Sequence, residues 1–215
     1  LRRVVCISSS SVYSKSDSGN QAERALISDI HKSEQSLAEQ CIRRDIRLLL
    51  LRPTLIYGCG LDQNISRIAR LVQRFRFFPV AGKASGLRQP IHAEDLAELG
   101  LAAIKSESLS SMESPVGGGS VMSYRQMVEK VFIALGLTPR ILSFPPALLA
   151  PLANLAALLP GSGGLNAEFV YRQNRDLVFD DSAIRRALAF STRPFAPTSA
   201  DFEIPENLRL LQPQD

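Results

Sequence analysis

The stretch Leu48-Leu-Leu-Leu-Arg-Pro-Thr-Leu-Ile-Tyr-Gly58 predicts a buried strand that runs into a polar, glycine-marked loop. Residues 46–51 are predicted to form one buried strand, and residues 3–8, which are β-branched and apolar on both faces, are predicted to form another, typical of a central strand in a parallel sheet. Two other segments have the same form, Ile7-Ser-Ser-Ser-Ser-Val-Tyr13 and Gly86-Leu-Arg-Gln-Pro-Ile-His-Ala-Glu-Asp-Leu-Ala97. Ligands bind at the carboxyl ends of strands in open parallel sheets, so we expect the functional site where these three loops meet.

A helix is predicted between the strands at 3–8 and 46–51. Ser18 and Gln21 have the spacing of a capping box, and the helix runs to about Arg44. Its apolar positions recur every three or four residues, at Leu26, Ile30, Leu37 and Cys41. A strand, a helix and a strand of this length predict a right-handed parallel βαβ unit.

The remainder alternates helices with short strands. Helices are predicted at 65–76, from 93 or 94 to 105, at 123–136 behind a Ser123–Gln126 capping box, and at 181–187; short strands are predicted at 77–80, 140–144 and 176–179. We interpret the serine-rich segment 106–114 as a loop, and Gly117-Gly-Gly119 as a turn rather than a phosphate loop.

The predicted fold class is α/β: the C-terminal part of a doubly wound parallel, Rossmann-like sheet with a smaller α/β substrate domain. Residues 1–60, with 88–105 returning to them, form the later half of a dinucleotide-binding domain. Residues 61–200 are mainly substrate domain, and 201–215 are a tail.

Composition narrows the class of protein. The 215 residues are 45% apolar, enough for a real core, and the net charge is only +4 with scattered basic residues, which disfavours nucleic-acid binding. Three distant cysteines predict neither a disulfide framework nor a metal site, and favour a reducing, cytoplasmic compartment. The proline-interrupted apolar stretch 144–160 favours a buried or lid helix over a membrane span or an interfacial helix.

The three loop motifs together resemble the extended short-chain dehydrogenase/reductase family, the NAD-dependent epimerase/dehydratase group. The resemblance extends from Val4 to about Pro197. It implies a doubly wound sheet that holds NAD or NADP, and a smaller domain that closes over a nucleotide-linked sugar. The implied chemistry is hydride transfer followed by epimerisation or dehydration.

The sequence departs from this family in lacking a G-x-G-x-x-G loop. That loop holds the cofactor's pyrophosphate, so we expect this chain alone to bind NAD(P) weakly. We interpret the chain as truncated or as half of a split fold. The exposed sheet edge would then be covered by a second copy of the chain or by the missing N-terminal segment.

The resemblance also suggests catalytic and cofactor-binding residues. Lys32 is the candidate for the family lysine, but Ser28 stands where the family has its tyrosine; the alternative is a solvated surface lysine. Ser9 fits the hydroxyl that bonds the reacting oxygen, or simply ends a strand. A further hypothesis is that Tyr13 stands near the ligand and substitutes for the lost phenol. The expected contacts of the cofactor are Ser8, Ser9, Lys32, Pro53 and Thr54.

The resemblance predicts binding of the sugar nucleotide by three residues. Arg88 corresponds to an arginine that contacts the diphosphate, a role that suits a guanidinium. Asn64 corresponds to a second ligand contact, and Arg172, or else Arg175, to a further arginine. The alternative for each arginine is a surface ion pair. We expect His92 to pack at a helix start rather than to act in catalysis.

The leading hypothesis is therefore an NAD(P)-dependent sugar-nucleotide epimerase/dehydratase-like protein with an atypical or impaired catalytic centre. A non-catalytic nucleotide-sugar-binding sensor or scaffold is the main alternative. A membrane-peripheral assembly factor that uses the apolar stretch 144–159 as an anchor is the third.

Overall fold

A three-stranded parallel sheet forms one end of the computed structural model, which describes residues 1–156 and 166–209. Strands β1 (Arg3–Ile7), β2 (Arg47–Pro53) and β7 (Met112–Val116) lie in the order β1-β2-β7. The parallel pairing of β1 with β2, with Cys6 opposite Leu50, confirms the predicted βαβ unit. Leu49 and its neighbour Leu50, whose side chains point to opposite faces, are both almost completely buried, as expected for a strand covered on both faces.

The strand β7 corrects our interpretation of 106–114 as a loop. Glu113 and Pro115 are poor strand residues, so local propensity hides the element. Within the described sheet β7 lies at the edge, where a proline without an amide hydrogen is tolerated, and the buried strand β2 supplies its pairing partner. Pairing with the distant strand β2, and not local propensity, therefore makes residues 112–116 a strand.

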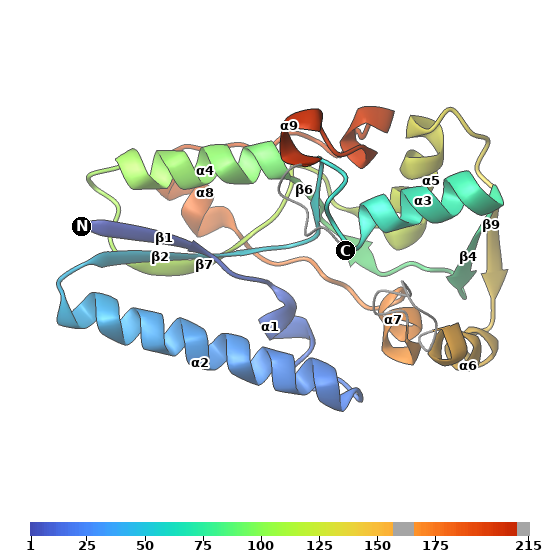
Figure 1. Cartoon of the computed structure of the whole chain (residues 1–215), viewed down its shortest axis with the longest axis horizontal. Coiled ribbons are helices and arrows are strands. Elements are labelled where there is room, and N and C mark those ends of the chain that lie inside the picture. Colours follow the sequence, from blue (N-terminus) through green and yellow to red (C-terminus); the bar gives the residue numbers. More distant parts are fainter. Residues whose placement is uncertain (157–165, 210–215) are drawn as a thin grey trace.

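Helices cover both faces of the sheet, as Figure 1 shows: α2 (Gln21–Arg43) on one side, α4 (Ala93–Lys105) and α8 (Ser182–Leu188) on the other. The N-cap of α2 is Asn20, not Ser18; the Asn20 Oδ1 atom accepts bonds from the backbone amides of Ala22 and Glu23. The predicted apolar stripe holds at Ile30, Leu37 and Cys41, which are partly or fully buried. It is wrong at Leu26, which is exposed, whereas the next residue, Ile27, is buried.

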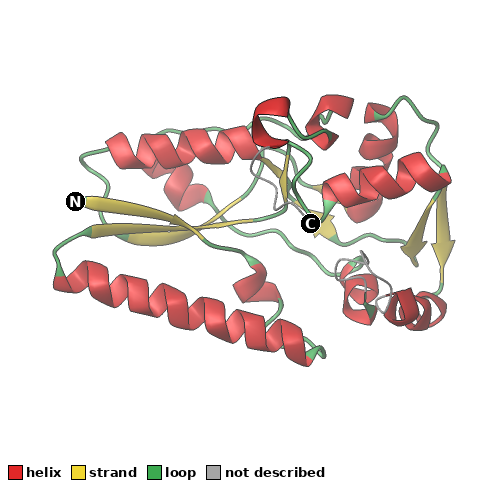
Figure 2. Ribbon diagram, viewed as in Figure 1, coloured by secondary structure: helices red, strands yellow, loops and turns green. Residues whose placement is uncertain are grey.

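The opposite end of the molecule combines helices with short two-stranded ladders (Figure 2). Its helices are α3 (Ile65–Phe75), α5 (Tyr124–Ala134), α6 (Pro146–Ala156) and α7 (Ala167–Arg172). Its ladders pair β3 (Ile56–Tyr57) with β6 (Ile91–His92), β4 (Phe78–Ala81) with β9 (Ile141–Phe144), and β5 (Leu87–Arg88) with β8 (Met122–Ser123). The short elements are α1 (Ser11–Ser14), the 3₁₀ helix η1 (Ser199–Phe202) and α9 (Glu206–Arg209).

Several local predictions for this end are confirmed and others are wrong. The Ser123–Gln126 capping box is present, and Gly136 follows α5 with a left-handed φ of 67°. The predicted strand 176–179 is reduced to one bridge between Arg88 and Leu177, and α9 lies within the predicted tail, whose residues 210–215 are outside the described part.

The apolar stretch 144–160 forms α6 up to Ala156; residues 157–160 are outside the described part. Only Ala150 of this helix is buried, whereas Leu148, Leu152 and Leu155 are exposed. Of the two expected forms, a buried helix or a lid helix, the buried one is therefore wrong for the described length, and the lid stays a prediction. Across residues 1–156 and 166–209, no helix combines the length and the apolarity needed to cross a bilayer.

The glycine run 117–119 is a place of close chain contact rather than a turn. A Cβ atom on Gly118 would lie 1.7 Å from the Pro90 carbonyl oxygen, and one on Gly119 would lie 2.4 Å from the Thr192 carbonyl oxygen. Any side chain at Gly118 or Gly119 would therefore clash with the neighbouring backbone, which explains why both positions are glycine.

Candidate functional site

A cavity of about 340 Å³ lies where the carboxyl ends of β1 and β2 meet α3, α5 and α7. It is the place that the strand-end loops predict, because ligands of parallel sheets bind there. Among the residues that line it are the polar or charged side chains of Ser9, Ser10, Ser11, Ser14, Lys15, Glu23, Thr54, Gln63, Asn64, Arg67, Arg88, Tyr124 and Arg172.

The strand ends place Ser9 and Thr54 side by side in the cavity wall. The amide of Ser10 donates to the Pro53 carbonyl at 3.0 Å, which extends the pairing of the two strands beyond β1. The Ser9 Oγ atom accepts from the Ser11 amide at 3.1 Å, and the Thr54 hydroxyl donates to the Gln89 carbonyl. Neither hydroxyl is therefore loosely placed.

Arg88 reaches the cavity from β5 and is only 3% exposed. Its guanidinium donates to the carbonyls of Leu87 and Arg175 at 2.8 Å and of Arg172 at 2.6 Å, and lies over the Tyr124 ring at 5.2 Å from the centroid. Burial lowers the pKa of Arg88 to about 10, so it stays charged at neutral pH. Arg88 thus supports the segment that carries Arg172 and places a cation in the wall.

Arg172 enters from α7 and forms a bidentate ion pair with Glu23, which lies in the first turn of α2. Both guanidinium nitrogens, Nη1 and Nη2, lie 2.8 Å from a Glu23 carboxylate oxygen. Burial alone raises the pKa of Glu23, but hydrogen bonds from Arg172 and Ser18 outweigh it and hold the pKa at about 2. The carboxylate is therefore charged wherever the protein is used near neutral pH.

Positive charge predominates in the cavity wall. Lys15, Arg67, Arg88 and Arg172 line it, whereas Glu23 is the one carboxylate among the lining residues that the structure describes. Burial lowers the pKa of Arg67, as it does for Arg88, because the charged form loses hydration. Asn64 lies in the same wall immediately before α3. Such a wall suits an anionic ligand.

The structure does not bring Lys32 into this cavity. Its side chain is 73% exposed, and its ammonium lies 3.6 Å from a carboxylate oxygen of Asp29 on the same helix. Ser28, at the position of the family tyrosine, is also exposed. The surface-lysine alternative therefore describes Lys32 in this structure, and no tyrosine–lysine relay is assembled from these two positions.

Ser8, Pro53 and Tyr13 also lie outside the lining of the cavity. The Ser8 hydroxyl donates to Glu34 at 2.5 Å, and the hydroxyl of Tyr13 accepts from Arg52 at 2.6 Å. Pro53 is buried at the end of β2. His92 packs at the start of α4 as predicted: its Nδ1 accepts from the Glu94 amide at 3.2 Å.

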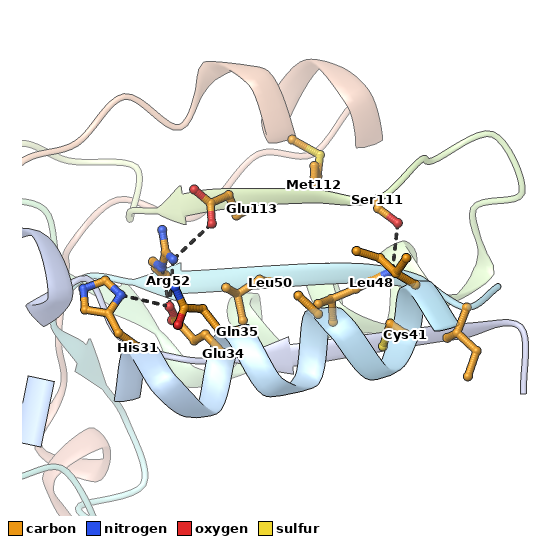
Figure 3. Close-up of a pocket in the computed structure, with 13 residues that line it drawn as sticks. His31, Glu34, Gln35, Cys41, Leu48, Leu50, Arg52, Ser111, Met112 and Glu113 are labelled. Carbon is orange, nitrogen blue, oxygen red and sulfur yellow. Dashed lines mark hydrogen bonds and ion pairs between the residues drawn. The ribbon is translucent and has the colours of Figure 1, made fainter. Parts of the chain in front are cut away.

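A second cavity, of about 430 Å³, lies between α2 and the strands β2 and β7 (Figure 3). Arg52 lies between Glu34 and Glu113 at its polar end, and Leu48, Leu50 and Met112 are among its apolar lining. Burial raises the pKa of Glu34, but hydrogen bonds from Arg52 and Ser8 lower it overall. The charges here already have partners within the protein.

Sequence reasoning missed five of these residues. Glu23, Arg67 and Tyr124 line the first cavity but carry no motif, and the Glu34–Arg52 pair was not anticipated. The available signals were an arginine within the apolar run 48–53 and a glutamate seven residues before Cys41 on the buried side of α2.

The two residues that the resemblance assigns to the hydride chemistry of a nicotinamide cofactor do not fit it. That chemistry needs a proton-relaying phenol beside a lysine, whereas Ser28 has no phenol and Lys32 is exposed to solvent. Ser9 and Thr54 supply hydroxyl groups to the cavity but no general base. These residues therefore supply no proton relay to a nicotinamide cofactor.

Comparisons with known proteins place the fold. No protein-family model matches the chain. The protein named "uncharacterized protein y4nG" of Sinorhizobium fredii is 25% identical over 158 residues, which are 73% of this chain and 39% of that protein.

Solved structures give longer alignments. The UDP-N-acetylglucosamine 4-epimerase of Bacillus cereus aligns with 100% of this chain, at a TM-score of 0.63 and 17% identity, and the alignment covers 66% of the epimerase. The UDP-glucose 4-epimerase of Thermotoga maritima, solved with UDP-glucose, aligns with 99% of this chain, at a TM-score of 0.65 and 12% identity, and the alignment covers 65% of that epimerase. MoeE5, solved with UDP-glucuronic acid and NAD, aligns over 98% (TM-score 0.60, 20% identity, 66% of MoeE5).

The chain thus spans 39% of the curated relative and about two thirds of each of these three structures. The predicted fold class is confirmed: the chain has the α/β, Rossmann-like fold of these three solved structures.

Proposed function

We propose that the cavity at the ends of β1 and β2 binds the diphosphate of a nucleotide-linked sugar. The observation that carries this proposal is the convergence of Lys15, Arg67, Arg88 and Arg172 on one cavity with a single carboxylate among its described lining. Guanidinium groups match phosphate oxygens in geometry and charge. Asn64 supplies an amide beside them for the same ligand.

The structural neighbours support this ligand class. MoeE5 was solved with UDP-glucuronic acid and the Thermotoga epimerase with UDP-glucose. Their fold is that of this chain, and the cavity lies at the sheet edge where such folds bind ligands. Our proposal is an epimerase/dehydratase-like protein that binds NAD or NADP weakly, with Ser9 and Thr54 beside the cofactor.

The catalytic centre in this proposal is atypical. Ser28 has no phenolic proton to relay, and Lys32 is exposed, which favours the second candidate: a nucleotide-sugar-binding sensor or scaffold without turnover. Incubation of the protein with UDP-glucose and NAD separates the two candidates. Formation of reduced cofactor or of an epimerised sugar supports the enzyme, and binding without product supports the sensor.

Titration calorimetry with UDP-glucose, UDP and NAD tests the binding site itself. Replacement of Arg172 by Gln removes a charged, bidentate donor, so we expect affinity for UDP to fall roughly tenfold or more. Arg43→Gln is the matched control, because Arg43 is exposed and pairs only with Glu39 among the described residues. Absence of UDP binding by the unmodified protein, or equal binding by Arg172→Gln, contradicts the proposal.

Two further proposals concern the surroundings of the protein. The free edge of β1, where Ile7 is 52% exposed, would be covered by a second copy of the chain or by another segment of polypeptide. Analytical ultracentrifugation distinguishes a dimer from a monomer. The free thiols of Cys6, Cys41 and Cys59 support a reducing, cytoplasmic compartment.

A further inference from the structure

Glu23 binds the guanidinium of Arg172, which the proposed ligand would need for its phosphate groups. Its two carboxylate oxygens take Nη1 and Nη2 of Arg172, both at 2.8 Å, and the two side chains line the same cavity. Both side chains are largely buried, 14% and 10% exposed. The edge of the guanidinium formed by Nη1 and Nη2, which can donate to two phosphate oxygens, is thus already filled by a carboxylate of this chain.

Several contacts hold the loop before Glu23 against α7. Asp17 lies 3.4 Å from the Arg175 guanidinium, and the Gly19 amide donates to Glu168 at 3.2 Å. The Glu23 amide is itself capped by the side chain of Asn20, which fixes the backbone of this helix turn. The carboxylate therefore has a fixed base and a rotatable side chain, so it can leave Arg172 without unfolding α2.

We propose that Glu23 is an internal competitor for the anion subsite at Arg172, so that a phosphate group of the ligand binds there only by replacing the Glu23 carboxylate. This inference rests on the proposed function in taking a nucleotide diphosphate as the ligand. It assigns Glu23 a role in setting affinity according to the ligand's charge.

Electrostatics gives the sign of the effect. A displaced Glu23 stays in the cavity wall, where its charge repels the phosphate groups that have taken its place. Lys15, 3.4 Å from Glu23, is the other cation that can receive the displaced carboxylate. Removal of the negative charge should therefore tighten the binding of anions, most for diphosphates and least for a neutral nucleoside.

The test measures the affinity of Glu23→Gln for UDP, UMP, uridine and inorganic pyrophosphate by calorimetry. We expect roughly tenfold tighter binding of UDP and pyrophosphate, a smaller gain for UMP, and none for uridine. Glu168→Gln is the matched control: it removes the same charge 4.0 Å from Arg172 but outside the cavity lining, and should change affinity by at most about twofold. The double variant Glu23→Gln/Arg172→Gln should lose the gain.

The outcomes separate this inference from the proposed function. If UDP binds the unmodified protein as tightly as Glu23→Gln, or more tightly, Glu23 positions Arg172 rather than competing for it, and the inference is overturned while the function stands. If Glu23→Gln gains affinity for pyrophosphate but neither protein binds UDP, the inference stands and the function fails. If neither protein binds any of these anions, both are overturned. Thermal melts of each variant establish that it is folded.

Discussion

Glu34 and Arg52 form a two-pronged ion pair across the interface of α2 and β2. The Nε atom of Arg52 lies 3.2 Å from Oε1 of Glu34, and Nη2 lies 2.8 Å from Oε2. Both side chains are less than 10% exposed. A helix that packs on a strand through a charged pair depends on both members being present.

Removal of one member of this pair should destabilise the protein strongly. Arg52→Met leaves the Glu34 carboxylate buried without its main partner, so we expect the free energy of unfolding to fall by about 3–5 kcal/mol. The double variant Arg52→Met/Glu34→Leu should recover much of this loss. Urea unfolding monitored by circular dichroism measures both. Equal losses for the single and double variants would mean that lost packing, not the orphaned charge, is the cause.

The Glu23–Arg172 pair should make stability depend on acidity. The folded-state pKa of Glu23 is about 2, below the ordinary value of 4.5. A lowered carboxyl pKa contributes stability that is fully present above pH 4.5 and is lost as the pH falls toward 2. Glu23→Gln should cost about 1–3 kcal/mol at neutral pH. In urea titrations the difference from the unmodified protein should shrink below pH 4.5; a constant difference down to pH 3 contradicts the assignment.

The Gly118 position should tolerate no side chain. Because an added Cβ would lie 1.7 Å from the Pro90 carbonyl oxygen, Gly118→Ala forces two backbone segments apart, and we expect a loss of about 3 kcal/mol or more. Gly100 in α4 has no atom within 4 Å of such a Cβ, so Gly100→Ala should stabilise the protein by about 0.5–1 kcal/mol. Thermal unfolding of the two variants should move in opposite directions.

Replacement of Tyr124 by Phe should stabilise the protein. The hydroxyl of Tyr124 is buried and has no hydrogen-bond partner within the described residues, so its removal relieves a desolvation cost of about 1 kcal/mol or more. The ring over which Arg88 lies is kept. Tyr171→Phe, at an exposed position of α7, is the control and should change nothing. A melting temperature lowered by Tyr124→Phe would show that the hydroxyl has a partner.

The sequence predicted the elements that local rules determine. The strands at 3–8 and 46–51, the helix between them, and the Ser123 cap follow from apolar periodicity and side-chain capping, which act over a few residues. The burial of the first strand was not predicted correctly, because β1 lies at the edge of the described sheet and Ile7 is exposed. The strand β7 could not be predicted this way, because its pairing with β2 bridges residues about sixty positions apart. The turn assigned to 117–119 failed for the same reason: the segments that exclude its side chains are distant in sequence.

Some residues of the candidate site were likewise predicted from the sequence, and others were not. Ser9, Thr54, Asn64, Arg88 and Arg172 were expected near one another, and all five line one cavity. Lys32 was predicted to be a site residue because it follows Ser28 by four positions. In the structure its face of α2 points to solvent, and Ile27 and Cys41 lie on the buried face. Glu23 could not be found from sequence, because its importance comes from Arg172, 149 positions away.

Arg88 connects the cavity to the backbone of the segment that follows α7. Its guanidinium is bonded to carbonyls of Leu87, Arg172 and Arg175, and the amide of Leu177 returns to Leu87. An anion that binds this guanidinium competes with these carbonyls for its N–H groups, and so weakens the bonds that hold the segment after α7. Binding of an anion in the cavity should therefore change the rate of hydrogen–deuterium exchange of residues 173–177, whether or not the protein is a catalyst.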